Sequence, residues 1–400
     1  MNILYLSISN ISLSQNSLYS DLIKSFSKKG HNIFLVCANQ RRNKEKTNLS
    51  NVNKDSVLRV KTGNTTKTNI IEKGISTLLI GQQFKRAIKK HFKNIKFDLV
   101  LYATPPITFA GVISYIKKRD NAKTYLLLKD IFPQNAVDIG MMTKIGVKAI
   151  IYKMFRKKEE RLYRVSDYIG CMSQANVDYI LKHNPEINPE IVHINPNSIE
   201  VEESALSEDK KAEIKAKYGI PENATTFIYG GNLGRPQGIP FLIECLKANK
   251  DKTDRFFVIC GTGTEYGKLK AYYDAEKPEN VLLINGLPKE EYDEFVKAFD
   301  VGLIFLDHRF TIPNFPSRLL SYMQSKMPVI ACTDPNTDIG KVAEEGGFGL
   351  WCESNNPANF TAAVDEMLTR DLKVMGEKAF TYLTENYTAD KSCEIILKHI

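Results

Sequence analysis

One stretch decides the fold of this 400-residue chain: Pro313-Asn314-Phe315-Pro316-Ser317-Arg318-Leu319-Leu320-Ser321-Tyr322-Met323, with Pro328-Val329-Ile330-Ala331 shortly after it. In it, polar Ser317 and Arg318 open an apolar helix, and the second apolar run predicts a buried strand. A helix N-terminus presents free N–H groups and partial positive charge, which suit a phosphate. Arg318 adds a fork-shaped donor for phosphate oxygens at this end.

A second turn suited to anions lies upstream, between an expected strand at 226–229 and an expected helix at 239–248. It has the sequence Tyr229-Gly230-Gly231-Asn232-Leu233-Gly234-Arg235-Pro236-Gln237-Gly238. Either turn alone is compatible with an ordinary loop between a strand and a helix. Two such turns in one half of the chain indicate a site for a nucleotide diphosphate.

The composition is typical of a globular protein with two domains. Hydrophobic residues make up 43% of the chain and charged residues 25%, and 400 residues exceed one ordinary domain. No apolar run approaches the ~18 residues of a membrane span, and residues 1–6 predict a buried strand rather than a signal peptide. The seven cysteines are odd in number and far apart, which favours reduced core residues in a cytosolic protein. They form no CxxC or HxxxH spacing with the six histidines, so we expect no metal site.

The net charge of +9 is divided unequally between the two halves. Residues 1–200 carry 32 Lys and Arg against 15 Asp and Glu, whereas residues 201–400 carry 23 against 31. The halves are therefore +17 and −8, which indicates two domains with different partners. The basic half could meet nucleic acid, anionic lipid or a phosphorylated acceptor.

Strands and helices alternate in both halves, which predicts parallel sheets with helices on both faces. The first half has expected strands at 3–7, 33–37, 99–103, 125–128, 168–172 and 191–194, and expected helices at 17–29, 81–93, 107–119, 144–164 and 174–182. The second half has expected strands at 226–229, 256–260, 281–284, 301–305, 328–331 and 349–351, and expected helices at 210–218, 239–248, 266–276, 290–298, 317–324, 339–344, 357–370 and 371–386. A break near 195–211 separates two doubly wound, Rossmann-like α/β domains that would face each other across a cleft, with ligands beyond the carboxyl ends of the strands.

The segment 144–164 contains eight Lys and Arg and two Glu. Its apolar residues recur at helical spacing: Val147, Ile151, Met154, Phe155, Leu162 and Val165. This pattern predicts a basic amphipathic helix, which suits a membrane surface. A helix packed on its own sheet with a solvated basic face fits the pattern equally well. On the first interpretation anionic lipid is contacted by Lys153, Arg156, Lys157 and Lys158.

The order of these motifs resembles the family 4 glycosyltransferases of the GT-B fold over nearly the whole chain. Gly30-His31-Asn32-Ile33 is similar to the family's entry to its second strand, and the 229–238 turn lies where the family has a diphosphate-binding loop. Within the family, the chain most resembles bacterial O-antigen and capsule transferases related to L-fucosamine transferases. Their Asp-Leu-Trp-Pro-Glu-Ser segment matches Asp130-Ile131-Phe132-Pro133-Gln134-Asn135, and their Pro-Ser-Lys-x-x-Glu-Tyr-Met segment matches residues 316–323.

The resemblance implies a nucleotide-sugar domain at 199–386 and an acceptor domain at 1–198, with 387–400 returning to the first domain. It places the donor against Gly231, Asn232, Arg235, Gln237, Glu265, Ser317, Arg318 and Ser321. Asp130 would orient the acceptor hydroxyl and Lys129 would steady the leaving group, although Asp130 also fits a turn aspartate and Glu265 a surface glutamate. We further assign Ser14 and Gln15 to an acceptor loop. In a retaining transfer of this family the leaving diphosphate takes the acceptor proton, so neither a protein nucleophile nor a metal cofactor is required.

The chain departs from the family pattern at three positions. The family's paired glutamates, eight positions apart, fall at Pro313 and Ser321, and the lysine of its loop falls at Gln237. Ser321 can hold a ribose only through a weaker neutral bond, while Arg235 and Arg318 could compensate for the missing lysine. These changes suggest a specialised donor or a catalytically silent subunit.

We therefore expect a hexosyl- or N-acetylhexosaminyl-type glycosyltransferase that moves a sugar from a UDP-linked donor to a lipid-linked saccharide in bacterial surface polysaccharide synthesis. Its expected location is cytoplasmic and peripheral, at the anionic inner face of the plasma membrane, with no nucleic-acid partner. One alternative is a silent subunit of the same fold that binds acceptor or a partner enzyme. Another is a sugar-nucleotide epimerase of the same fold.

Overall fold

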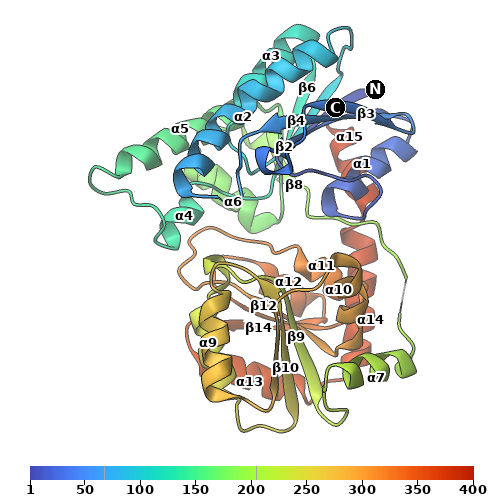
Figure 1. Ribbon diagram of the computed structural model, residues 1–400, viewed down its shortest axis with the longest axis vertical. Coiled ribbons are helices and arrows are strands. Elements are labelled where there is room, and N and C mark those ends of the chain that lie inside the picture. The colour runs from blue at the N-terminus through green and yellow to red at the C-terminus, as the bar shows by residue number, and fades with distance from the viewer. Residues whose placement is uncertain (67, 204) are drawn as a thin grey trace. The chain divides into compact units, whose positions relative to one another are not determined.

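The computed structural model describes residues 1–66, 68–203 and 205–400, which divide into two compact units (Figure 1). One unit combines Met1–Glu200 with Thr388–Ile400, and the other is Val201–Tyr387. These breaks lie within two residues of the expected boundaries after 198 and 386. In the N-terminal unit the returning segment begins where Ile199 and Thr388 form a parallel β-bridge.

The N-terminal unit contains an eight-stranded sheet in the order β3-β4-β2-β1-β5-β6-β7-β8. Its pairs are parallel except β3 with β4. The strands are β1 Asn2–Ser7, β2 Asn32–Gln40, β3 Asn48–Val52, β4 Asp55–Thr62, β5 Leu99–Ala103, β6 Lys123–Leu128, β7 Tyr168–Cys171 and β8 Val192–Ile194. The helices are α1 Leu18–Lys28, α2 Ile70–His91, α3 Ala110–Asp120, α4 Gln134–Asp138, α5 Ala149–Val165, α6 Gln174–His183 and α15 Ala389–Lys398.

Helices of the N-terminal unit pack against one another in two groups. The C-terminal helix α15 lies beside α1, as the red and blue ribbons of Figure 1 show. Cys393 and Ile396 of α15 and Phe26 of α1 are fully buried in one core cluster with strand residues. In the second group α3 contacts both α2 and α5. The alternating pattern therefore yields the expected parallel sheet, with the chain's last helix completing its core.

Several elements of this unit differ from the sequence-based expectation, and the short helix α4 is one that was not expected. The hairpin of β3 and β4 is additional, and its turn contains Asn53 with φ +55°, a backbone conformation that asparagine tolerates well. Helix α2 begins at Ile70, eleven residues before the expected start at 81. Helix α5 begins at Ala149 rather than at 144, so the first basic residues of the 144–164 segment precede the helix.

The C-terminal unit contains a six-stranded parallel sheet in the order β11-β10-β9-β12-β13-β14. Its strands are β9 Thr225–Asn232, β10 Arg255–Thr262, β11 Val281–Ile284, β12 Val301–Phe305, β13 Val329–Thr333 and β14 Gly349–Glu353. Its helices are α7 Glu208–Lys217, α8 Ile239–Ala248, α9 Tyr266–Glu276, α10 Lys289–Phe295, α11 Arg318–Gln324, α12 Ile339–Glu345, α13 Pro357–Met367 and α14 Leu372–Asn386.

This strand order is that of a doubly wound nucleotide-binding sheet. From β9 the chain adds strands first toward one edge of the sheet and then, from β12 onward, toward the other edge. Ligands of such sheets bind outside the carboxyl ends of the strands at the reversal. The glycine-rich turn follows β9, and the segment that contains Arg318 follows β12. The fold therefore brings both turns that suggested a diphosphate to one edge of this unit.

Candidate donor and acceptor sites

The turn after β9 is shaped by close backbone contacts. Gly231 has φ +119°, a conformation that favours glycine. A Cβ atom on Gly261, at the end of neighbouring β10, would lie 1.9 Å from the carbonyl oxygen of Gly231. Further along the turn, the Leu233 carbonyl accepts a hydrogen bond from the Glu265 amide at 2.9 Å. The loops after β9 and β10 are therefore packed backbone to backbone, which fixes the shape of the turn.

Gln237 stabilises the same turn from inside. Its Oε1 accepts hydrogen bonds from Asn232 Nδ2 at 2.9 Å and from the Gly234 amide at 3.1 Å. Asn232 itself is exposed at the end of β9. Three of the residues expected to bind the donor lie in this turn. Gln237 holds the turn together through its side-chain carbonyl oxygen, while Gly231 and Asn232 form the solvent-exposed edge of the turn.

Arg318 lies over this turn although it is 87 residues away in the sequence from Gly231. A Cβ atom on Gly231 would lie 3.7 Å from its guanidinium, which stacks on the Tyr229 ring at 4.3 Å from the ring centroid. Its Nη1 is buried and has no hydrogen-bond partner among the described residues. Nor does Arg318 form an ion pair with any carboxylate in that part of the chain. A half-buried guanidinium with a buried, unpartnered Nη1 beside a glycine turn suits an anion, because a buried donor without a partner is unfavourable.

Tyrosines that the sequence-based analysis did not identify surround Arg318. The hydroxyl of Tyr322 accepts a hydrogen bond from the Gly230 amide at 3.1 Å. The hydroxyl of Tyr292 lies against Gly230, where an added Cβ would be 1.7 Å from it. Only the apolar spacing of α11 could have suggested the burial of Tyr322, and nothing local links Tyr292 to the turn. The Tyr229 ring, on which the guanidinium stacks, holds it in place without neutralising it.

The remaining donor residues differ in exposure. Ser317 is exposed immediately before α11, and its side chain makes no capping hydrogen bond. Ser321 is half-buried one turn later, and Pro313, at the position of the other family glutamate, is buried. Arg235 is largely exposed and its Nε lies 3.7 Å from Glu265 Oε1. The structure thus brings Gly231, Arg235 and Arg318 to one edge, with no acidic residue at the two family positions.

One interpretation of the sequence placed Glu265 on the surface, and the structure shows that it does not lie there. It is buried and forms ion pairs with Arg235 and Lys268. The hydrogen bond from its backbone amide to the Leu233 carbonyl connects it to the glycine turn. Glu265 therefore orients Arg235 at the same edge and has a carboxylate that is already shared between two cations.

Lys129 and Asp130 directly follow β6 in the N-terminal unit. Both backbone amides donate to Thr104 Oγ1 at 3.0 Å, which fixes the chain between β6 and the end of β5. The Lys129 Nζ donates to the Asn195 carbonyl at 3.3 Å, and burial lowers the pKa of this lysine to about 7. Asp130 Oδ1 accepts from Asn135 Nδ2 at 2.7 Å, and burial raises the pKa of its carboxyl to about 6. Adjacent residues with such opposite shifts are candidates for proton handling.

Glu159 of α5 is a buried acid that the sequence-based analysis missed. It accepts hydrogen bonds from Arg156 at 2.6 Å and from the Tyr163 hydroxyl at 2.7 Å. Burial raises its pKa to about 7, and the charge of Asp130 contributes to the same effect. The ring of Phe155, one helical turn earlier, contacts Phe132 in the loop after Asp130. Helix α5 is thus joined to the Asp130 loop by an aromatic contact, and the charges of Glu159 and Asp130 influence each other.

Ser14 and Gln15 lie in the loop between β1 and α1, and both are exposed. Ser14 Oγ hydrogen-bonds to Ser12 Oγ at 2.8 Å, and the Gln15 carbonyl accepts from Ser20 Oγ at 2.7 Å. The structure gives this loop a defined shape, and the acceptor role of these two residues stays a prediction.

The four basic residues assigned to a membrane surface do not share one environment. Lys153 and Lys157 are exposed and Lys158 is half-buried. Arg156 is instead occupied within the protein by ion pairs with Glu159 and Glu160 and by a hydrogen bond to Asn184. Arg156 therefore anchors α5 to its neighbours and is the least available of the four for lipid.

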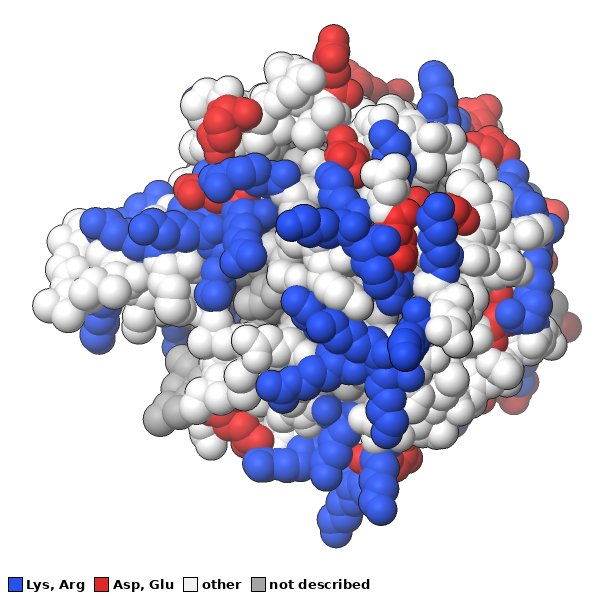
Figure 2. Space-filling view, turned by 90° about the horizontal axis from the view of Figure 1, so that it is seen from above, with Lys and Arg blue, Asp and Glu red and all other residues white. Residues whose placement is uncertain are grey.

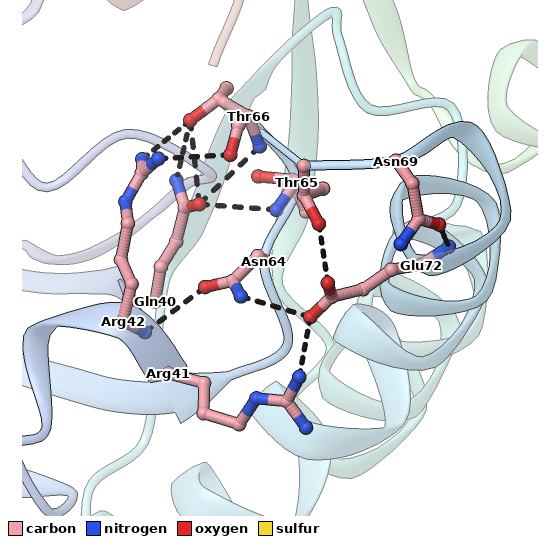
Figure 3. Close-up of polar contacts among 9 residues, drawn as sticks. Gln40, Arg41, Arg42, Asn64, Thr65, Thr66, Asn69 and Glu72 are labelled. Carbon is pink, nitrogen blue, oxygen red and sulfur yellow. Dashed lines mark hydrogen bonds and ion pairs between the residues drawn. The ribbon is translucent and has the colours of Figure 1, made fainter.

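A polar cluster at the ends of β2 and β4 fixes the start of α2 (Figure 3). Gln40 Oε1 accepts from the amides of Thr65 and Thr66 at 3.1 and 3.3 Å. Glu72 accepts from Arg41 at 2.8 Å and from Asn64 at 2.9 Å. The asparagine that caps α2 completes the cluster, since Asn69 Oδ1 accepts from the Glu72 amide at 2.8 Å. These bonds hold the long helix at its first turn.

The described residues contain no group of three or more His, Cys, Asp or Glu that could hold a metal ion. Within the same residues, no helix is long and apolar enough to cross a membrane. The seven cysteines are all buried and unpaired.

Comparison with known proteins agrees with the fold. Residues 210–381 match the family model described as "Glycosyl transferases group 1". The probable glycosyltransferase WbjE of Pseudomonas aeruginosa is 24% identical over 330 residues, which cover 82% of this chain and 80% of that protein. The putative colanic acid biosynthesis glycosyl transferase WcaI of Escherichia coli is 19% identical over 278 residues, 68% of this chain and 67% of that one. The solved structure "Trehalose-6-phosphate from E. coli bound with UDP-2-fluoro glucose" superposes with a TM-score of 0.74 at 10% identity, over 99% of this chain and 98% of that one.

The fold is therefore GT-B, with two parallel-sheet α/β domains. Residues 210–381 thus match the group 1 glycosyl transferases, and the resemblance of the chain to family 4 glycosyltransferases of bacterial surface polysaccharides is confirmed.

Proposed function

We propose that the protein is a retaining glycosyltransferase that uses a nucleotide-diphosphate sugar, UDP-linked, and a lipid-linked saccharide acceptor in bacterial surface polysaccharide synthesis. The observation that supports a nucleotide-sugar donor is the Arg318 guanidinium, which lies beside the Gly231 turn without a carboxylate partner in the described residues. The relative WcaI is named for colanic acid biosynthesis, which supports a role in polysaccharide synthesis, and a structure of similar fold is described with UDP-2-fluoro glucose, which supports a UDP-linked donor.

Arg318, Arg235 and the amides of the glycine turn would stabilise the charge that develops on the diphosphate as it leaves. Asn232 would hold the donor at the open edge of the turn, and the exposed Ser317 hydroxyl would add one neutral bond. No described ligand set for a metal accompanies these groups, so we propose that transfer needs no metal ion.

In the N-terminal unit, Asp130 would accept a hydrogen bond from the acceptor hydroxyl and orient it. The proton then passes to the departing diphosphate, as a same-face transfer requires. Lys129, fixed by the Asn195 carbonyl, would donate to the donor or the leaving group while it is protonated. The pair therefore supplies orientation rather than a covalent nucleophile.

A silent subunit of the same fold is the second candidate, because Pro313 and Ser321 replace both family glutamates. The test is to incubate the purified chain with a panel of UDP-sugars, with and without a lipid-linked saccharide extract, and to measure released UDP. Acceptor-dependent release of UDP is expected. A chain that binds UDP but releases none with any donor would contradict the enzyme and favour the silent subunit, and turnover of a donor without acceptor into an isomer would favour an epimerase.

A further inference from the structure

The positive charge of the molecule is concentrated in one layer of helices. Helices α2, α3 and α5 together carry 14 Lys and Arg against four Asp and Glu, a net charge of +10. The whole chain carries +9, so everything outside these helices sums to nearly zero. Because α3 contacts both of the others, the charge forms one continuous layer. Figure 2, seen from above, shows basic side chains gathered on this side with few acidic ones between them.

This charge is not neutralised inside the protein. The four acids of the layer already pair with basic residues: Glu72 with Arg41, Asp120 with Arg119, and Glu159 and Glu160 with Arg156. Lys117 pairs with Asp167. Within the described part of the chain, the other eleven basic side chains of these helices form no ion pair: Lys73, Lys85, Arg86, Lys89, Lys90, Lys118, Lys153, Lys157, Lys158, Arg161 and Arg164. Repulsion among them opposes folding unless an anionic partner is present.

Apolar side chains are exposed in the same layer. The segment before α5 and its first turn expose Ile145 by 82%, Val147 by 84% and Ile150 by 67%. Lys144, just before Ile145, and Lys148, between Val147 and Ile150, are also exposed. This segment is the protrusion at the left of Figure 1 that leads into α5. Exposed contiguous apolar residues rimmed by lysines mark an interaction site.

The structure differs here from the amphipathic helix expected from the sequence. Leu162, in the second half of the expected stripe, is fully buried in the unit's core, whereas Val147 and Ile151 in the first half are exposed. Helix α5 is therefore packed on its unit at one end and presents apolar residues at the other. Helix α2 adds Ile75, Leu78 and Leu79, which are also exposed and lie in the turns that follow the polar cluster of Figure 3.

We infer that the α2–α3–α5 layer is a docking surface for an anionic bilayer, with residues 145–151 inserted among the lipid headgroups. Lysine and arginine near such a surface each contribute on the order of 1 kcal/mol, and exposed isoleucine and valine add a contact that salt does not screen. Nucleic acid would account for the charge but not for the apolar tip. The biological role of this docking surface rests on the proposed function, because docking would bring the protein to a lipid-linked acceptor that is fixed in the membrane.

The test is sedimentation of the full chain with vesicles of phosphatidylglycerol and phosphatidylcholine, or of phosphatidylcholine alone, at about 0.05 and about 0.5 M NaCl. A charge variant carries Lys89→Gln, Lys90→Gln and Lys118→Gln, and a tip variant carries Ile145→Ser, Val147→Ser and Ile150→Ser. The matched control changes three exposed lysines of the C-terminal unit, Lys252→Gln, Lys277→Gln and Lys373→Gln. Circular dichroism melting confirms that each variant folds.

Binding to the anionic vesicles at low salt is expected, weakened about tenfold or more in the charge variant and unchanged in the control. The tip variant should lose the binding that remains at high salt. Absence of wild-type binding at low salt, equal weakening in the control, or tighter binding to a DNA duplex than to the vesicles would each overturn the docking surface. Calorimetry with UDP separates the two proposals, since loss of vesicle binding with intact UDP binding contradicts only this surface, and the reverse contradicts only the donor site.

Discussion

Lys129 and Asp130 are adjacent residues whose charged forms are both disfavoured by burial. The pKa of Asp130 is raised to about 6 and that of Lys129 is lowered to about 7. Thr104 holds both backbone amides, so neither residue can move away from this environment without breaking two hydrogen bonds. A half-buried, fixed pair of this kind has a defined range of pH in which both charges exist.

This range predicts the pH dependence of transfer. If Asp130 acts as a carboxylate and Lys129 as an ammonium, activity rises as pH passes about 6 and falls as it passes about 7. Measurement of kcat/KM from pH 5 to 9 checks this. A Lys129→Arg variant should move the fall to higher pH, because arginine stays protonated. If kcat/KM of Lys129→Arg falls at the same high pH as that of the wild type, Lys129 is not the group that sets this fall.

The raised pKa of Asp130 also predicts an effect on stability. The folded protein holds this proton more tightly than the unfolded chain. The stabilising contribution of Asp130 is therefore fully present below the ordinary aspartate pKa of 3.8 and is lost as pH rises through about 6. Asp130→Asn should therefore melt at the same or a higher temperature than the wild type at pH 7.5, while transfer falls strongly. A lower melting temperature with undiminished activity would make Asp130 a structural turn residue.

At the scale of elements, the loops after β9 and β10 work as one unit. Gly261→Ala would place a methyl group 1.9 Å from the Gly231 carbonyl, so the two strand ends must separate. We expect a loss of stability of about 1–3 kcal/mol, in the range of overpacked sites, together with weaker UDP binding. The matched control is Gly267→Ala in α9, where an added Cβ meets nothing within 4 Å. Chemical denaturation and UDP titration of both variants check this, and equal behaviour of the two would contradict the packing argument.

The sequence predicted the parallel sheets and the positions of the two strand-to-helix turns well, because buried strands and glycine turns leave local patterns. It did not predict the β3–β4 hairpin. Nor did it predict the early start of α2, because the apolar periodicity is weak there and the polar cluster around Glu72 determines where the helix begins. Nor could it place Tyr292 against Gly230 or pair Glu265 with Arg235, since these contacts join loops from different strands. Gln237 shows the same limit: its match to a family lysine suggested a ligand contact, and its Oε1 instead bonds within the turn.

At the scale of the whole molecule, the charge split of +17 and −8 has a structural origin. Helices α2, α3 and α5 together have a net charge of +10, which is most of the +17 of residues 1–200. In the C-terminal unit, the edge proposed for the donor contains Arg318, which has no carboxylate partner in the described residues. The protein thus separates an extended basic surface from a small, sharply defined anion site.

The small site predicts independence from metal ions. Because Arg318 and the backbone amides of the turn already supply positive charge to a diphosphate, a chelator should leave transfer unchanged to within about twofold. Transfer is measured after dialysis against EDTA and again with added Mg²⁺ or Mn²⁺. Loss on chelation that Mn²⁺ restores would show that a cation takes part and that the arginine alone is insufficient.

The most direct measurement is calorimetric titration of UDP into the wild type, Arg318→Ala and Asp130→Asn. Loss of the charge-assisted bond should weaken UDP binding by roughly 1.5–3 kcal/mol in Arg318→Ala, about 10- to 150-fold. Asp130→Asn should bind UDP as the wild type does, because that residue belongs to the acceptor unit. Equal affinity of the wild type and Arg318→Ala would contradict the donor site on which the proposed glycosyl transfer depends.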